Sequence, residues 1–428
     1  MAENITKRNA QTLLFASFWT IGLITFLNFM NPYVFEILGI PEDKQGSLAG
    51  LLVALQEATQ LAICGFIGSW SDRIGRRPIY VGGLLLLAAG FAVYPLAMNE
   101  YQLIALRVFY AVGATTCTVM LSTCLGEYID DRTRGRWMGV VAIANGLGIV
   151  TMAIGVSKLP LLFGQLGLDS VTALRSSFWV CATVILLLAV LLQLGLQPPT
   201  ATPTRAHASL LKQTLNGLAL ARNKPMLAMR YLTAFASKGD LVIVTTFISL
   251  WVVQAGLAAG MSPGAAVARA GMVFGITSGV ALTWSIFMGM ILDRIPRLIA
   301  VGIAFALASI GYICIALVTD PLGSMIFVAA VLVGIGESSV IISAGTLIGQ
   351  SAPAGDRGAA FGVYGFAGSA GILVLSFAGG KLYDAFGGGA PFLMMGVING
   401  LIVVAALLLF YWQRIAGSTP CQERLEEN

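Results

Sequence analysis

The sequence has little charge. Only 11% of its 428 residues are charged and 57% are hydrophobic, against about 25% and roughly 45–50% in ordinary soluble domains. The 25 basic and 20 acidic residues are too few to cover a soluble chain of this length with polar groups. A water-soluble multi-domain protein is therefore excluded, and the apolar excess is expected to face lipid.

Residues needed for enzyme chemistry are also scarce. The one histidine, His207, lies in a polar stretch, which excludes a Ser-His-Asp set or an intramembrane histidine metal site. The six cysteines have no C-x-x-C spacing, which argues against a structural zinc site. Because there is no Walker-type phosphate loop, ATP hydrolysis is not expected as the energy source. We therefore expect no enzyme and no cofactor, and the sequence leaves any metal ligands unknown.

Long apolar runs are what the chain has instead. A helix needs about 20 apolar residues to cross the hydrocarbon core of a membrane, and the runs divide into twelve segments. The predicted spans cover residues 12–35, 45–69, 79–98, 102–125, 137–158, 174–196, 228–254, 268–291, 298–318, 322–348, 359–380 and 390–412. No cleavable signal peptide is expected, because the first run is too long. The fold class predicted is an all-α multi-pass membrane protein.

One long polar interruption separates the first six spans from the last six. It begins with Pro198, Pro199 and Pro203, which stop the sixth helix, and continues with leucines among basic residues, typical of a short interfacial helix. The predicted division is an N-terminal six-helix bundle over residues 1–196, a cytoplasmic linker over 197–227, a C-terminal six-helix bundle over 228–412 and a cytoplasmic tail over 413–428.

The positions of the basic residues predict the orientation. With both termini cytoplasmic, 18 of the 25 lie inside, five lie outside, and Arg107 and Lys238 fall within spans. Lys and Arg in short loops resist translocation, so this ratio decides the topology. The net charge of +5 then reflects orientation and not nucleic-acid binding. The expected partners are the lipid bilayer and a small solute or ion, with no nucleic acid, and the chain is expected to be a monomer, alone or within a membrane protein assembly.

The two halves repeat a loop motif. The pattern G-x-x-x-D-R-I-x-R begins at Gly68 and again at Gly289, 221 residues later. A second pattern, R-G-x-x-x-G, begins at Arg134 and at Arg357, 223 residues apart. Two motifs at nearly one offset imply a duplicated six-helix unit.

The first loop resembles the signature loop of the major facilitator superfamily, G-x-L-A-D-R-x-G-R-R, and the resemblance extends over the chain through helix count, linker and repeat. It implies two bundles related by an axis along the membrane normal, rocking about a site near the midplane. In the family this loop locks the bundles together on the cytoplasmic side in one transport state. The matching gating residues are Gly68, Asp72, Arg73, Gly75, Arg76, Arg77, Asp293 and Arg294. Simple anchoring of the membrane orientation is the alternative for the arginines.

Five ionisable residues fall well inside the predicted spans, away from their ends: Glu57, Arg107, Lys238, Asp240 and Glu337. Such residues are rare in lipid and usually face a cavity or each other, so each is a candidate for the substrate or ion pathway. Lys238 and Asp240 flank Gly239, where we expect a local helix break that presents polar backbone; the alternative is that they form an ion pair, with each other or across helices. For a proton or cation site the order of preference is Asp240, Glu337, Glu57.

Arg107 begins a partial match to the family motif R-x-x-Q-G-x-G, linked in proton-coupled members to proton transfer. Tyr110 and Ala111 replace its Gln and first Gly. A buried arginine costs several kcal/mol unless it is paired, so we expect a partner, whether the role is structural or coupling. Asn28, Asn31 and Tyr364 are further pathway candidates, with hydrogen bonding between helices as the alternative.

Residues 8–46 resemble the magnetosome-associated major facilitator proteins of magnetotactic bacteria. This resemblance implies a secondary active transporter that moves some form of iron, ion or chelate, across the magnetosome membrane for magnetite biomineralisation; the bacterial inner membrane is the other expected location. Two alternatives stay open. One is a plasma-membrane transporter of small organic ions or drugs, and the other is a non-transporting sensor or scaffold with the same fold.

Overall fold

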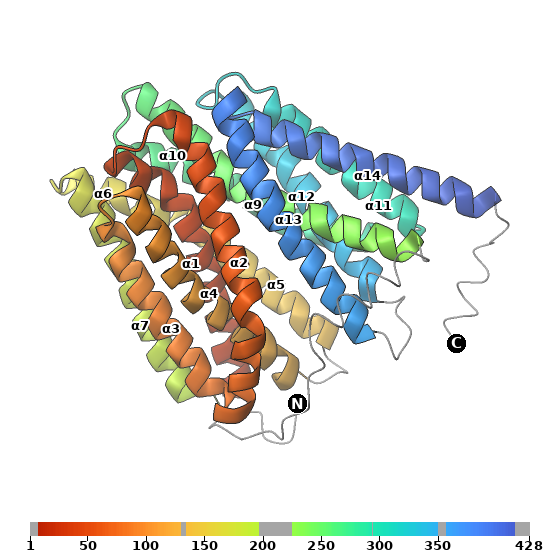
Figure 1. The fold of residues 1–428 in the computed structure, drawn as a ribbon, viewed down its shortest axis with the longest axis horizontal. Coiled ribbons are helices and arrows are strands. Elements are labelled where there is room, and N and C mark those ends of the chain that lie inside the picture. Colours follow the sequence, from red (N-terminus) through yellow and green to blue (C-terminus); the bar gives the residue numbers. More distant parts are fainter. Residues whose placement is uncertain (1–6, 130–133, 197–224, 293, 350–356, 416–428) are drawn as a thin grey trace.

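A computed structural model describes residues 7–129, 134–196, 225–292, 294–349 and 357–415 (Figure 1). Within this part of the chain, twelve helices are long and apolar enough to cross a membrane. Each predicted span overlaps one of them, which confirms the all-α multi-pass fold class. The predicted interfacial helix of the linker and the tail beyond Ile415 lie outside the described residues.

The first half of the chain forms the N-terminal bundle. Its membrane helices are α1 (Lys7–Ile37), α2 (Glu42–Ile74), α3 (Arg76–Val93), α4 (Glu100–Tyr128), α5 (Arg134–Ile154) and α7 (Ser170–Gly195). Three short helices, η1 (Tyr94–Leu96), η2 (Val156–Lys158) and α6 (Leu159–Gln165), connect them. Because successive membrane helices alternate in direction, the α1–α2 turn and the α2–α3 turn mark opposite ends of the molecule, here called the α1–α2 end and the α2–α3 end.

The second half forms the C-terminal bundle, which lies beside the first (Figure 1). Its helices are α9 (Pro225–Ala258), α10 (Pro263–Leu292), α11 (Arg297–Ala316), α12 (Met325–Gly349), α13 (Arg357–Phe386) and α14 (Ala390–Ile415). The helix α9 starts three residues before residue 228, the predicted start of this bundle.

Local sequence signals set the ends of the helices that carry the candidate residues. Gly75 separates α2 from α3 with a φ of 103°, a left-handed conformation that favours glycine because other residues are strained there. Asn99 starts α4, since its side chain accepts a hydrogen bond of 2.9 Å from the backbone N–H of Gln102, a common N-cap arrangement.

The bundles meet through small residues of α2 and α13. A Cβ added to Gly50 would lie 2.2 Å from the carbonyl oxygen of Ser376, and one added to Gly380 would lie 2.4 Å from that of Gly46. Such close backbone approach is possible only where side chains are small. The same holds between α10 and α5, where a Cβ on Gly271 would lie 2.1 Å from the carbonyl oxygen of Ala153.

Burial along α2 is uneven. Its buried residues cluster between Gln45 and Glu57, and beyond Glu57 only Ile67 and Ser71 are buried. The half of α2 nearest the α1–α2 end is therefore covered, while much of the other half is accessible. This pattern is that of two bundles closed against each other at the α1–α2 end.

Candidate transport site and gates

A carboxylate from one bundle accepts hydrogen bonds from the backbone of a helix of the other at the α1–α2 end. Asp384, near the end of α13, accepts hydrogen bonds of 2.8 Å from the backbone N–H groups of Gly46 and Ser47. Both donors lie near the N-terminus of α2, where the helix dipole favours negative charge. Asp384 joins the two bundles, and its only signal in the sequence is that of an acid following a predicted span.

A second set of contacts closes the same end. The side chain of Gln254 on α9 donates to Gln45 of α2 at 2.9 Å and accepts from the Tyr383 hydroxyl at 2.6 Å. Deeper in, the hydroxyl of Ser249 donates to the carbonyl oxygen of Phe29 at 2.7 Å. The ring of Phe29 also stacks on Phe274 of α10, with centroids 5.9 Å apart. We call these contacts, together with Asp384, the closed-end gate.

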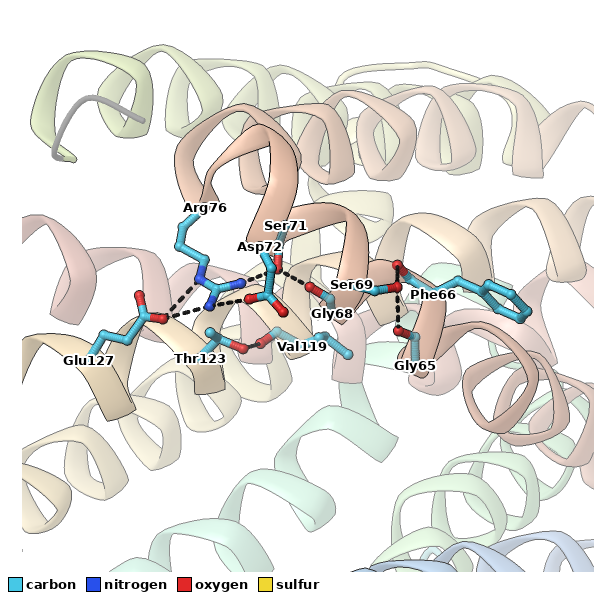
Figure 2. A network of polar contacts seen from close by, with 10 residues as sticks. All are labelled: Gly65, Phe66, Gly68, Ser69, Ser71, Asp72, Arg76, Val119, Thr123 and Glu127. Carbon is cyan, nitrogen blue, oxygen red and sulfur yellow. Dashed lines mark hydrogen bonds and ion pairs between the residues drawn. The ribbon is translucent and has the colours of Figure 1, made fainter. Parts of the chain in front are cut away.

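The signature loop at the other end is held by an ion-pair cluster (Figure 2). The Nη2 atom of Arg76 lies 2.6 Å from Asp72 and 2.7 Å from Glu127 of α4. The Nε atom of Arg76 donates to Glu127 at 2.9 Å, and its Nη1 atom donates to the Ser71 hydroxyl. The turn between α2 and α3 is thereby tied to the end of α4, and Glu127 is a partner that the sequence analysis missed.

Within the described residues these signature-loop contacts stay inside the N-terminal bundle. Gly68 accepts a hydrogen bond from the Ser71 hydroxyl at 2.7 Å, and Arg73 is exposed. The Nε atom of Arg77 is buried without a hydrogen-bond partner. In the second copy of the loop Arg294 is exposed, while Asp293 lies outside the described residues. The locking role implied by the family resemblance stays a prediction.

Arg107 is fully buried in the N-terminal bundle among neutral partners. Its Nε atom donates to the carbonyl oxygen of Leu52 at 3.2 Å, and its Nη2 atom donates to the side-chain oxygen of Asn28. The guanidinium lies 5.4 Å from the centre of the Tyr110 ring, a favourable cation–π distance. The expected partners exist, but among the described residues none of them is a carboxylate, and the Nη1 atom has no partner.

The amide of Asn31 lies in the same cluster. Tyr94 donates to its oxygen at 2.9 Å and also interacts with Arg107. The Nδ2 atom of Asn31 is buried without an acceptor. Both predicted asparagines therefore take part in hydrogen bonds that join parts of the bundle, and Asn28 is in addition half-buried and not fully covered.

Two acids are buried in the C-terminal bundle. Asp240 on α9 has no exposed surface, and its Oδ1 atom accepts a hydrogen bond of 2.9 Å from Asn399 of α14. Glu337 on α12 is 5% exposed and close enough to interact with the charge of Asp240, and Tyr312 of α11 interacts with both. The Oδ2 atom of Asp240, the Oδ1 atom of Asn399 and the Tyr312 hydroxyl lack hydrogen-bond partners. The cluster therefore holds more oxygen acceptors than donors, and its donors are the Asn399 amide and the Tyr312 hydroxyl.

The expectation of a helix break at Gly239 was wrong. The helix α9 runs without interruption from Pro225 to Ala258, and the glycine instead leaves room for Leu375 of α13, whose Cδ1 atom would lie 2.2 Å from an added Cβ. A continuous helix turns about 100° per residue, so Lys238 and Asp240 face different sides and do not pair with each other.

Lys238 lies instead at the junction of the bundles. It is exposed although it lies near the middle of α9, and it packs beside Gly368 of α13. Its charge interacts with Glu57 of α2, which is 6% exposed, accepts a hydrogen bond of 3.4 Å from Gln60 and interacts with Ser369 of α13. The Lys238–Glu57 interaction therefore joins the two bundles.

The remaining pathway candidate, Tyr364, has a structural partner. Tyr364 on α13 interacts with Ser237 of α9, a contact within the C-terminal bundle. Among the residues whose side chains are described, no group of three His, Cys, Asp or Glu residues is placed to hold a metal ion. The structure thus brings the predicted candidates into three separate groups: the Arg107 cluster, the Asp240 cluster and the Lys238–Glu57 junction.

This architecture of paired helical bundles is that of solved membrane transporters. The nucleoside transporter NupG superposes with a TM-score of 0.74 at 14% identity, covering 94% of this chain and 99% of that one. A bacterial homologue of the human lysosomal transporter Spinster, solved inward-facing and unoccupied, superposes with a TM-score of 0.70 at 15% identity, covering 95% and 97% of the two chains. At this identity the likeness shows the fold alone.

The chain belongs to the Major Facilitator Superfamily, whose sequence profile matches residues 13–321 and 262–424. The magnetosome protein MamH of Paramagnetospirillum magneticum is 25% identical over 95% of this chain and 94% of its own length. The magnetosome protein MamZ of Magnetospirillum gryphiswaldense is 27% identical over 87% of this chain, which spans only 58% of MamZ. The inner membrane transport protein YajR of Escherichia coli is 22% identical over 93% of this chain and 80% of its own length.

Proposed function

We propose that the protein is a secondary active transporter, not an enzyme, and works by alternating access between its two bundles. The main support for this proposal is the polar gate between the bundles at the α1–α2 end, together with the increasing exposure of α2 toward the α2–α3 end. The bundles on either side of the linker (1–196 and 228–412) are the proposed moving bodies.

The proposed orientation places the α2–α3 end and both termini in the cytoplasm. Basic residues gather at this end, among them Arg73, Arg76, Arg77, Arg136 and Arg294, and Lys and Arg in short loops resist translocation. This orientation supports the proposal that the closed-end gate faces away from the cytoplasm and that the conformation is inward-facing.

Asp240 and Glu337 form the proposed coupling site. Two buried carboxyl groups that interact cannot both carry charge without a large cost, since no basic residue within the described chain pairs with them. A proton held by the pair removes one charge and also supplies a donor to the unpartnered oxygen atoms. Loading and release of that proton would then alter the packing among α9, α11, α12 and α14.

Iron, as an ion or a chelate, is the proposed cargo, and a magnetosome or inner membrane is the proposed location. Support comes from similarity to two magnetosome proteins, one of them along nearly the whole of both chains. The iron cargo is what the resemblance to magnetosome-associated transporters implies for this chain.

Uptake into vesicles tests this proposal. The purified full-length chain is reconstituted into proteoliposomes, a pH gradient is imposed, and a panel of free iron ions, iron chelates and organic ions is offered. We expect an iron species to accumulate, with the accumulation abolished in Asp240→Asn but kept in Asp43→Asn, a change to an exposed acid of α2. No uptake of any iron species would refute the iron proposal.

A second candidate cargo is a small organic ion or drug carried across the plasma membrane. The observation that favours it is the similarity to YajR over most of both chains and to the multidrug resistance protein MdtH of Aeromonas hydrophila, 30% identical over 37% of this chain. Accumulation of an organic ion without accumulation of iron in the same panel would select this candidate.

A further inference from the structure

At the junction between the bundles, the basic residue is exposed and the acidic residues are buried. Lys238 is exposed halfway along α9, and because an ammonium group is unstable against lipid, its exposure marks a water-accessible side. Asp240 has no exposed surface and points into the C-terminal bundle toward Asn399. Glu57, the one candidate acid at the junction, is 6% exposed and interacts with Ser369 and Lys238. The accessible charge at mid-membrane is therefore positive.

The Arg107 cluster adds a second positive group, and this one has donors to spare. Arg107 Nη1 and Asn31 Nδ2 are buried N–H donors without acceptors, and within the described chain no carboxylate neutralises the guanidinium. A buried cation without a counter-charge is costly. A group with negative oxygen atoms would satisfy both donors and the charge together.

The position of this cluster connects it with the closed-end gate. Asn28, which accepts a hydrogen bond from Arg107, is half-buried and directly precedes Phe29 in α1. Phe29 accepts a hydrogen bond from Ser249 and stacks on Phe274, so opening the gate would withdraw two C-terminal side chains from Phe29, the residue after Asn28. Lys238 lies eleven residues before Ser249 in α9, or about 16 Å further toward the α2–α3 end.

We propose that the cargo carries an oxyanion group, a carboxylate or a phosphate, which binds at Arg107, Asn28 and Asn31 when the gate is open and passes Lys238 on its way through. This inference rests on the proposed transport function and narrows it: the cargo is an anionic chelate or organic anion and not a bare cation. Asp240 and Glu337 of the C-terminal bundle then bind the proton and not the cargo.

Binding to the purified full-length chain tests the site directly. Radiolabelled citrate and inorganic phosphate are the two probes, and their relative affinity distinguishes a carboxylate from a phosphate preference. We expect either probe to bind, choline not to compete, and the affinity to fall at least about tenfold in Arg107→Gln. Arg269→Gln is the matched control, because Arg269 bonds the Leu322 carbonyl oxygen and stacks on Phe327 within the C-terminal bundle.

A second variant covers the case in which Arg107→Gln does not fold. Asn28→Asp keeps the size of the side chain and supplies the missing negative charge beside Arg107. We expect this variant to melt at a higher temperature than wild type in the absence of anions and to lose oxyanion binding by at least about tenfold. A purely structural arginine would show the first effect without the second.

The outcomes separate the inference from the proposed function. The oxyanion site would be overturned if Asn28→Asp bound oxyanions as wild type does. It would also be overturned if vesicles took up free iron or an organic cation without competition by citrate or phosphate. Neither result would count against transport. If Asn28→Asp lost oxyanion binding but wild-type vesicles moved no solute, the first result would support the site and the second would refute transport.

Discussion

Removal of the Asp384 carboxylate is expected to loosen the α1–α2 end. In Asp384→Ala the backbone N–H groups of Gly46 and Ser47 lose their partner from the other bundle. Hydrogen bonds to a charged group contribute about 1.5–3 kcal/mol each, but Asp384 is half-buried, so water replaces part of what is lost. For the pair we expect about 1–3 kcal/mol, which shifts the ratio of closed to open molecules by about 5- to 150-fold toward open.

Hydrogen–deuterium exchange of residues 42–50 in nanodiscs measures this shift, because opening exposes these amides to water. We expect their exchange to quicken in Asp384→Ala, together with exchange at the end of α13. Asp320→Ala is the control: Asp320 also accepts a backbone N–H, that of Leu322, but within the turn before α12. If exchange at residues 42–50 were the same in Asp384→Ala as in wild type, the gate assigned to Asp384 would be wrong.

Three further expectations concern packing, the signature loop and the buried acids. Gly50→Ala should destabilise the closed state by about 1–3 kcal/mol, because its Cβ would lie 2.2 Å from the Ser376 carbonyl oxygen. Gly68→Ala should not, because no atom lies within 4 Å of a Cβ added there. Thermal unfolding in detergent compares the two variants. Arg76→Ala should lower the melting temperature more than Arg73→Ala, because Arg76 ties Asp72 to Glu127 and Arg73 is exposed; equal melting temperatures would remove the cluster's structural role. Asp240→Asn combined with Glu337→Gln should abolish the cellular phenotype while membrane insertion stays normal; an intact phenotype would instead favour the sensor or scaffold.

The membrane helices were predictable because their signal is local. Runs of apolar residues long enough to cross a bilayer are a property of consecutive residues. The boundary between α2 and α3 at Gly75 also has a local cause, since the left-handed φ found there favours glycine.

The partners of the buried charges were not predictable, because they come from distant parts of the chain. Asp240 bonds Asn399, and Gly46 bonds Asp384. In each pair, the sequence around one residue carries no pattern that indicates its partner. The relative positions of Lys238 and Asp240 were predictable from the sequence, because residues that are two positions apart on an uninterrupted helix face different sides. The error came from reading Gly239 as a break, when its function is to admit Leu375.

The most direct test of the account is whether cargo and protons cross the membrane together. Proteoliposomes that enclose a pH-sensitive dye, with no gradient imposed, receive the iron species or anion that the binding and uptake assays select. We predict that entry of the cargo changes the internal pH in wild type and not in Asp240→Asn with Glu337→Gln. Entry of cargo with no change in pH would contradict the coupling role of the buried acids, and no entry at all would contradict transport.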